Sequence, residues 1–234
     1  MRKVVALSVS LILAACTPAA SGPTPIPGVT GPTATTPIPA TTPSPTPAPT
    51  SPIPPIPAPV AVEVPVKGAA LLVLDITSAI CPPRPSCLTS VPKIANLVKK
   101  ARDAKVPVIY SLTATAGSTV QPEIAPLAGD ATVTGRADKF FGTTLEKILQ
   151  DKAVENAVVV GSAANGAVLY TVFGLNLRGI TVVVAQDGIS AEPEFPITLT
   201  RWQLLNQPGF TNADNKPLAK GFVTLSTTEL VTFK

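Results

Sequence analysis

Histidine is absent from the 234-residue chain. This absence excludes serine and cysteine hydrolase machinery that relies on a histidine base, and it excludes histidine-ligated zinc sites. Charge is also scarce, because no charged side chain occurs from residue 17 to residue 62. The formal net charge of +4 includes Arg2 and Lys3, and without these two the chain carries 16 basic against 14 acidic side chains. A nucleic-acid partner normally needs a clustered basic surface, so we expect none.

The first 16 residues have the pattern of an export signal. Arg2 and Lys3 precede the apolar run 4–14, which is shorter than the roughly 20 residues that a membrane-spanning helix needs. The sequence Leu-Ala-Ala-Cys at 13–16 resembles a bacterial lipobox, in which the cysteine carries the lipid. The resemblance implies a lipoprotein signal peptide over 1–16 with Cys16 as the lipid attachment site, and a protein anchored extracytoplasmically to a bacterial membrane, at the cell surface or the periplasmic face. An ordinary signal peptide with a chance cysteine is the alternative.

Residues 17–66 are rich in proline and threonine and hold 17 of the 28 prolines. Proline lacks a backbone donor, so this composition favours an extended, disordered linker over a helix or a sheet. A linker of this kind would hold a folded domain away from a lipid surface. The remaining residues, 67–234, are enough for one domain with a substantial core.

The segment 67–234 alternates apolar runs with amphipathic stretches, which is typical of an α/β domain with a parallel sheet. We predict strands at 69–75, 106–112, 131–134, 157–160, 180–185 and 222–225. We predict helices opened by Ser90 and by a capping box of Thr143 and Glu146, followed by helices at about 165–177 and 196–206. Ligands bind at the carboxyl ends of the strands in such sheets, which places Asp75 and Asp187 at the expected ligand edge. Tyr170 is interpreted as a packing residue.

Three ordered blocks carry a resemblance to a known family: Leu-Leu-Val-Leu-Asp at 71–75, Phe-Phe-Gly-Thr-Thr-Leu at 140–145, and Val-Val-Val-Gly at 158–161 followed by a helix. Together they resemble the isochorismatase-like cysteine hydrolases over about residues 68–209. The resemblance implies a three-layer, doubly wound and mostly parallel sheet with helices on both faces, and a small-molecule site. We expect no cofactor and no metal.

Active members of this family carry an Asp at the end of the first strand, a Lys near the second block and a Cys nucleophile at the start of the helix after the third. The Asp accepts the thiol proton, the Lys supports the thiolate, and backbone N–H groups hold the oxyanion. Asp75 matches the first position. The lysine is open: an alignment without gaps places it on Thr134, while Lys139 lies five residues later and is either in the cleft or solvated at a helix start.

The cysteine position departs from the family pattern. Active members place the thiol six residues after Gly161, where this chain has Ala167, and a methyl group cannot attack a carbonyl. The chain resembles a divergent branch that lacks the nucleophile. The resemblance also places a cis peptide at the bond after Ser162, and Ser162 itself has no histidine base to activate it.

Ligand binding would survive such a loss, because the start of a helix favours anions. The expected ligand-binding residues are Ser162, Ala163, Asn165 and Gly166.

Two further features concern cysteines and the last acidic loop. Cys81 and Cys87 flank a proline-rich loop, and in an exported protein this spacing favours a disulfide over two free thiols. Asp187 either shapes the pocket wall or caps the turn at Gly188.

Three functions remain open. The first is a membrane-anchored hydrolase-family domain that binds a small molecule without cysteine hydrolysis. The second is an active hydrolase or amidohydrolase that uses Asp75 and water, helped by Lys139. The third is a structural domain that forms homo-oligomers through helices beside the sheet.

Overall fold

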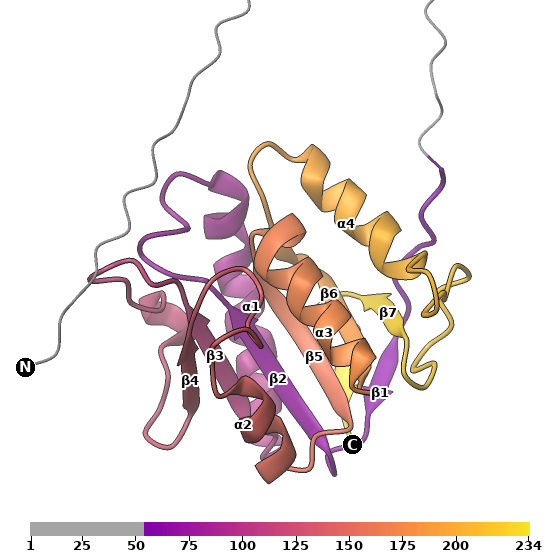
Figure 1. Cartoon of the computed structure of the whole chain (residues 1–234), viewed down its shortest axis with the longest axis horizontal. Helices are drawn as coiled ribbons and strands as arrows, with labels where there is room; N and C mark the ends of the chain where they lie inside the picture. The colour runs from indigo at the N-terminus through magenta and orange to yellow at the C-terminus, as the bar shows by residue number, and fades with distance from the viewer. Residues whose placement is uncertain (1–53) are drawn as a thin grey trace, which may run out of the picture. The chain divides into compact units, whose positions relative to one another are not determined.

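A computed structural model describes residues 54–234 of the chain (Figure 1). The predicted signal peptide, the lipid attachment site Cys16 and most of the predicted linker lie outside the described residues. No helix within residues 54–234 has the length and apolar character needed to cross a membrane.

The centre of the fold is a six-stranded sheet in which every pair of neighbouring strands is parallel, in the order β4-β3-β2-β5-β6-β7. Its strands are β2 (Ala69–Leu74), β3 (Val108–Leu112), β4 (Ala131–Thr134), β5 (Asn156–Ser162), β6 (Thr181–Ser190) and β7 (Val223–Ser226). The helices are α1 (Pro85–Asp103), α2 (Leu145–Asp151), α3 (Leu169–Leu177) and α4 (Phe195–Leu205). This architecture confirms the predicted fold class.

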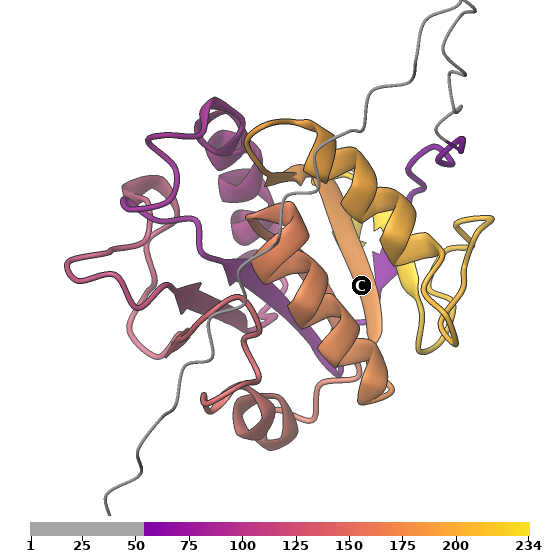
Figure 2. The same ribbon diagram turned by 45° about the horizontal axis from the view of Figure 1, so that its top comes forward.

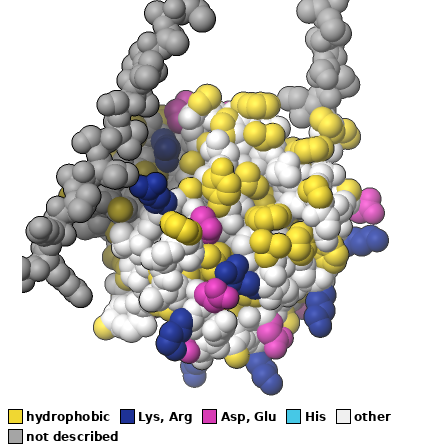
Figure 3. All heavy atoms as spheres, viewed as in Figure 1, with side chains coloured by type: hydrophobic (Ala, Val, Ile, Leu, Met, Phe, Trp, Pro, Cys, Tyr) yellow, Lys and Arg dark blue, Asp and Glu magenta, His cyan; other side chains and the backbone are white. Residues whose placement is uncertain are grey.

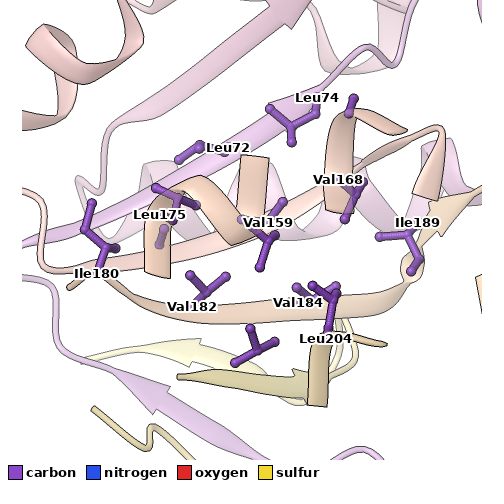
Figure 4. Close-up of a cluster of buried hydrophobic side chains, with 14 of the residues drawn as sticks. Leu72, Leu74, Val159, Val168, Leu175, Ile180, Val182, Val184, Ile189 and Leu204 are labelled. Carbon is purple, nitrogen blue, oxygen red and sulfur yellow. The ribbon is translucent and has the colours of Figure 1, made fainter. Parts of the chain in front are cut away.

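Helices cover both faces of the sheet, as Figures 1 and 2 show. Alternate residues of a strand point to opposite faces. Accordingly, Leu72 and Leu74 of β2 pack with α2, α3 and α4, whereas Leu71 and Val73 pack with α1. Figure 4 shows the first of these two cores, in which side chains of β2, β5 and β6 meet α3 and α4. Burial on both faces explains why these strands are continuous apolar runs in the sequence.

A second, two-stranded parallel sheet joins β1 (Val62–Val64) to β8 (Val231–Phe233), and the sequence did not predict it. Val62 and Val64 are buried, and the backbone N–H of Val66 donates to the carbonyl oxygen of Lys234 at 2.9 Å. The folded unit therefore begins before residue 67, and the predicted linker boundary at residue 66 is corrected. Strand β1 has only three residues, too few for a pattern to stand out beside the prolines.

One predicted helix start is wrong, and the cap predicted for a second helix does not form, although α2 begins within one residue of the predicted start. Helix α1 begins at Pro85, five residues before Ser90, and the Ser90 hydroxyl donates instead to the carbonyl oxygen of Cys87 at 2.7 Å. The capping box does not form, because the carboxylate of Glu146 pairs with Arg178 at 2.9 Å. Thr143 still accepts a bond from the backbone N–H of Leu145 at 3.1 Å.

Candidate functional site

A cavity of about 360 Å³ lies where β2 and β5 end, at the carboxyl edge of the parallel sheet. Asp75 lines it from the end of β2, Ser162 lines it from the end of β5, and Ala163, Gly166 and Ala167 line it from the segment that follows β5. The structure therefore brings together five of the residues that the sequence selected, from segments far apart in the chain.

Asp75 and Lys139 form a buried ion pair beside this cavity. The Nζ of Lys139 lies 2.7 Å from Oδ2 of Asp75, and the Lys139 side chain is fully buried. Lys139 is thus not solvated at a helix start: it is buried against Asp75, behind the lining of the cavity. The same ammonium also donates to the carbonyl oxygen of Gly135 at 3.2 Å.

The backbone of Asp75 is in the left-handed region, with φ of 54°. Aspartate tolerates this conformation better than most side chains, but it still costs free energy and clusters at functional sites. The turn lies where the chain leaves the sheet, and it places Asp75 in the lining of the cavity. Ser111, at the end of β3, completes this arrangement: its hydroxyl donates to Oδ1 of Asp75 at 2.7 Å.

Burial raises the pKa of Asp75 above its ordinary value. The positive charges of Lys139 and Arg84 and the hydrogen bonds from Lys139 and Ser111 act on the pKa in the opposite direction, and burial is the largest effect. The carboxyl is therefore suited to exchange a proton with a bound molecule nearer to neutral pH than an exposed aspartate would be.

The second sequence block fixes the position of Lys139. The Phe140 ring packs against Gly174 of α3, where an added Cβ would lie 2.6 Å from the ring, so only glycine permits this approach. The guanidinium of Arg178 lies 3.8 Å from the centre of the same ring. The Thr143 hydroxyl donates to the Lys139 carbonyl oxygen. These contacts hold the lysine backbone against α3 and aim its side chain at Asp75.

The end of β5 and the segment after it are irregular, and of their detail only the cis bond after Ser162 was expected. Gly161 approaches β2 so closely that an added Cβ would lie 2.6 Å from the carbonyl oxygen of Leu74. The bond between Ser162 and Ala163 is cis, in agreement with the expectation from the resemblance. A π-helical turn, Ala164–Val168, then leads into α3, where a single α-helix was predicted.

Two residues of this segment differ from their expected roles. Asn165 is exposed and does not line the cavity. The backbone N–H of Gly166 donates to the carbonyl oxygen of Ala163 at 3.1 Å, so it is already used within the turn and is not free for a ligand oxygen. The buried methyl group of Ala167, in contrast, forms part of the cavity wall.

Sequence reasoning missed two arginines at the cavity, Arg84 and Arg136. Arg84 is half-buried, and its Nη1 donates to Oγ of Ser162 at 3.2 Å. Arg84 comes from the loop between Cys81 and Cys87, which form the predicted disulfide. The sequence signalled Arg84 only as a charged residue in a short loop that follows Asp75 closely. Nothing in the spacing of the residues showed that this loop folds over the end of β2.

Asp187 has neither of its two predicted roles. Its carboxylate accepts bonds from the backbone N–H and the hydroxyl of Thr228 at 2.8 Å and 2.9 Å, and it does not line the 360 Å³ cavity. The residue instead ties β6 to the chain after β7. Within residues 54–234 there is no group of three or more His, Cys, Asp or Glu side chains that could hold a metal ion.

Comparisons with known proteins agree with this fold. The family model of the isochorismatase domain matches residues 69–197. A cysteine hydrolase from Pseudomonas syringae pv. phaseolicola is similar in structure, with a TM-score of 0.61, 19% identity, and coverage of 74% of this chain and 94% of that one. N-carbamoylsarcosine amidase from Thermoplasma acidophilum has a TM-score of 0.57 and 20% identity, with coverage of 69% of this chain and 96% of that one.

A nicotinamidase from Staphylococcus aureus gives a TM-score of 0.56 and 16% identity, with coverage of 62% of this chain and 98% of that one. At these identities the likeness concerns the fold. No curated protein matches the sequence.

Proposed function

The chain belongs to the isochorismatase family, and from this premise we propose that its folded domain binds a small molecule in the cavity beside Asp75 without thiol catalysis. The observation that carries the proposal is the combination of an intact Asp75–Lys139 pair with the methyl group of Ala167 in the cavity wall. By the resemblance, active members have their nucleophilic thiol at this position. A pocket that retains its charged pair but has lost the nucleophile is equipped for binding.

The first experiment restores the missing atom. The Ala167→Cys variant and the wild type are assayed against a panel of amides, and ligand binding is followed in parallel by thermal shift. If the pocket is otherwise complete, the variant hydrolyses at least one amide that the wild type only binds, and it forms an acyl adduct on the introduced thiol that mass spectrometry detects. A covalent adduct on a side chain of the wild-type cavity would contradict the proposal.

Hydrolysis by water, with Asp75 transferring the proton, is the second candidate function. The raised pKa of the Asp75 carboxyl favours it, because a carboxylate whose pKa is raised is a stronger base toward a bound water than an exposed one. Two of the similar structures are an amidase and a nicotinamidase. Turnover of amides or enol ethers by the wild type that is lost in Asp75→Asn would establish this function. The pH dependence of such turnover would give the role: a rate that falls as the pH rises means that Asp75 acts as an acid.

An exposed apolar face supports the third function, homo-oligomerisation through helices. Tyr170 and Leu177 of α3 are 54% and 59% exposed, and Phe195 of α4 is 59% exposed, so Tyr170 is not the packing residue that was predicted. Figure 3 shows hydrophobic side chains gathered over these two helices. We expect a self-associating domain whose assembly weakens in a Leu177→Lys variant. Sedimentation that finds wild-type monomers at micromolar concentration would argue against assembly.

We further propose that the domain is held at a bacterial membrane through a lipid on Cys16, outside the cytoplasm. The motif at 13–16 and the proline-rich composition of the linker support this. Expression in a bacterium fed a labelled fatty acid tests it: the wild type should incorporate the label and sediment with membranes, and Cys16→Ser should do neither. Equal labelling of both proteins would contradict the proposal.

A further inference from the structure

We propose that Arg84 binds the carboxylate group of the ligand, so that the cavity selects small monocarboxylates with an apolar body. This inference rests on the proposed binding function and names its ligand class.

The cavity has an uncompensated positive charge. Its charged lining residues are Asp75, Arg84 and Arg136, and the negative charge of Asp75 is already paired with Lys139. Within residues 54–234, no carboxylate lies within 4.0 Å of either arginine. An anionic ligand would supply the missing charge, and in a partly enclosed cavity such an ion pair is stronger than on an open surface.

Arg84 has donors to spare. Its guanidinium carries five N–H groups, and the one protein contact found for them among the described residues is the bond from Nη1 to Oγ of Ser162. This bond orients the planar guanidinium and leaves its other N–H donors available. A guanidinium held in this way presents its remaining donors to two oxygens of a carboxylate in parallel. Arg136 is exposed, so Arg84 is the partly buried cation that a single negative charge would balance.

The remainder of the wall is mostly apolar. Besides the charged residues it includes the side chain of Ile80 and the methyl groups of four alanines, Ala114, Ala137, Ala163 and Ala167, with three hydroxyl groups from Thr113, Thr115 and Ser162. A volume of about 360 Å³ lies near the lower end of the range for small-molecule sites. A compact apolar body with one anionic group matches this lining.

The disulfide loop fixes where Arg84 stands. The backbone N–H of Arg84 donates to the carbonyl oxygen of Cys81 at 2.8 Å, and the N–H of Cys87 donates to the carbonyl oxygen of Arg84 at 2.9 Å. Both sulfurs are buried and joined to each other. Arg84 is also the residue that precedes the first turn of α1. The guanidinium is therefore presented from a closed loop, and we expect reduction of the disulfide to weaken carboxylate binding.

The test compares paired probes that differ chiefly in charge. Binding of benzoate, benzamide, butyrate and butyramide to the wild type, Arg84→Met and Arg84→Lys is measured by calorimetry, with thermal unfolding as the control for folding. The wild type should bind each carboxylate at least about tenfold more tightly than its amide, and Arg84→Met should abolish this preference by weakening carboxylate binding more than amide binding. Arg84→Lys should recover part of the preference for carboxylates. In the wild type, reduction of the disulfide should weaken this preference and its restoration should recover it.

Each failure has a distinct meaning. If the wild type binds amides as well as carboxylates, or if Arg84→Met keeps the preference, the assignment to Arg84 is wrong while the binding function stands. If phenyl phosphate binds more tightly than benzoate and depends on Arg84, the site takes phosphates and the carboxylate class is wrong. If no probe of any kind binds the folded wild type, the proposed function and this inference fall together.

Discussion

Removal of one partner of the Asp75–Lys139 pair should destabilise the domain strongly. At 2.7 Å and an effective dielectric constant of about 20, the attraction between the two charges is roughly 6 kcal/mol, which offsets the cost of removing both from water. In Lys139→Met the carboxylate stays buried without its cation, and the loss of stability is expected to be about 3 to 5 kcal/mol. For a domain of this size about 3 kcal/mol lowers the melting temperature by roughly 6 to 12 °C.

The assay is chemical and thermal unfolding of Lys139→Met, Asp75→Asn and the variant that carries both changes. The double variant leaves no unpaired charge, so it should recover most of the stability that either single change removes. If each single variant loses less than about 1 kcal/mol, the pair behaves like an exposed one, and the reasoning from burial is refuted.

The same variant should show a defined pH dependence. Without Lys139, the pKa of Asp75 rises further than burial already raises it. Below the ordinary carboxyl value of 3.8 the group is protonated in the folded and unfolded states alike, and its contribution to stability is fully present. As the pH rises from 3.8 through the raised pKa of Asp75 in the folded state, this carboxyl ionises more readily in the unfolded chain than in the folded one, and its contribution to the free energy of unfolding is lost. The deficit of Lys139→Met should therefore be larger at about pH 8 than at about pH 4, and the double variant should lack this trend.

Two further predictions concern the backbone around the cavity. Gly161→Ala should lose about 1 to 3 kcal/mol of stability in urea unfolding, because its new methyl group would lie 2.6 to 2.7 Å from atoms of Leu74. Gly166→Ala is the matched control: the nearest atom to its new methyl group is 3.8 Å away, so this variant should unfold like the wild type. Replacement of both Cys81 and Cys87 by alanine should cost about 2 kcal/mol from the freed loop; an unchanged urea midpoint would show that the loop is held by its other contacts.

The sequence predicted most of the central sheet, because strands buried on both faces are visible as apolar runs. Strand β4 was predicted with the bounds that the structure shows. The carboxylate at the end of β2 was found for the same reason. The position of Lys139 was not decided by sequence, since the residues between Thr134 and Lys139 form an irregular loop in which spacing along the chain does not give spacing in space.

Other features depend on contacts between distant segments and were missed. Ser111 meets Asp75 only because β3 lies next to β2, and the hydroxyl of a strand-end serine carries no signal of its own. Arg84 reaches the cavity because a disulfide folds its loop back. The helix start at Pro85 was missed because a capping residue was sought, whereas the fixed φ of proline suits the first helical position without one.

The pairing of β1 with β8 has a mechanical consequence. A pull on the chain ahead of residue 54 reaches the domain through the bonds of Ala58 to Asn215 and of Val60 to Leu225, and then through β1. The main-chain bonds of β1 run to β8 and Lys234, whose backbone N–H donates to the carbonyl oxygen of Val64 at 3.0 Å. The two ends of the fold thus fasten each other, close together in Figure 1. Removal of β8 would leave β1 without its partner strand and expose Val62 and Val64 to water. The cavity lies at the carboxyl edge of the central sheet, and neither β1 nor β8 contributes to its lining.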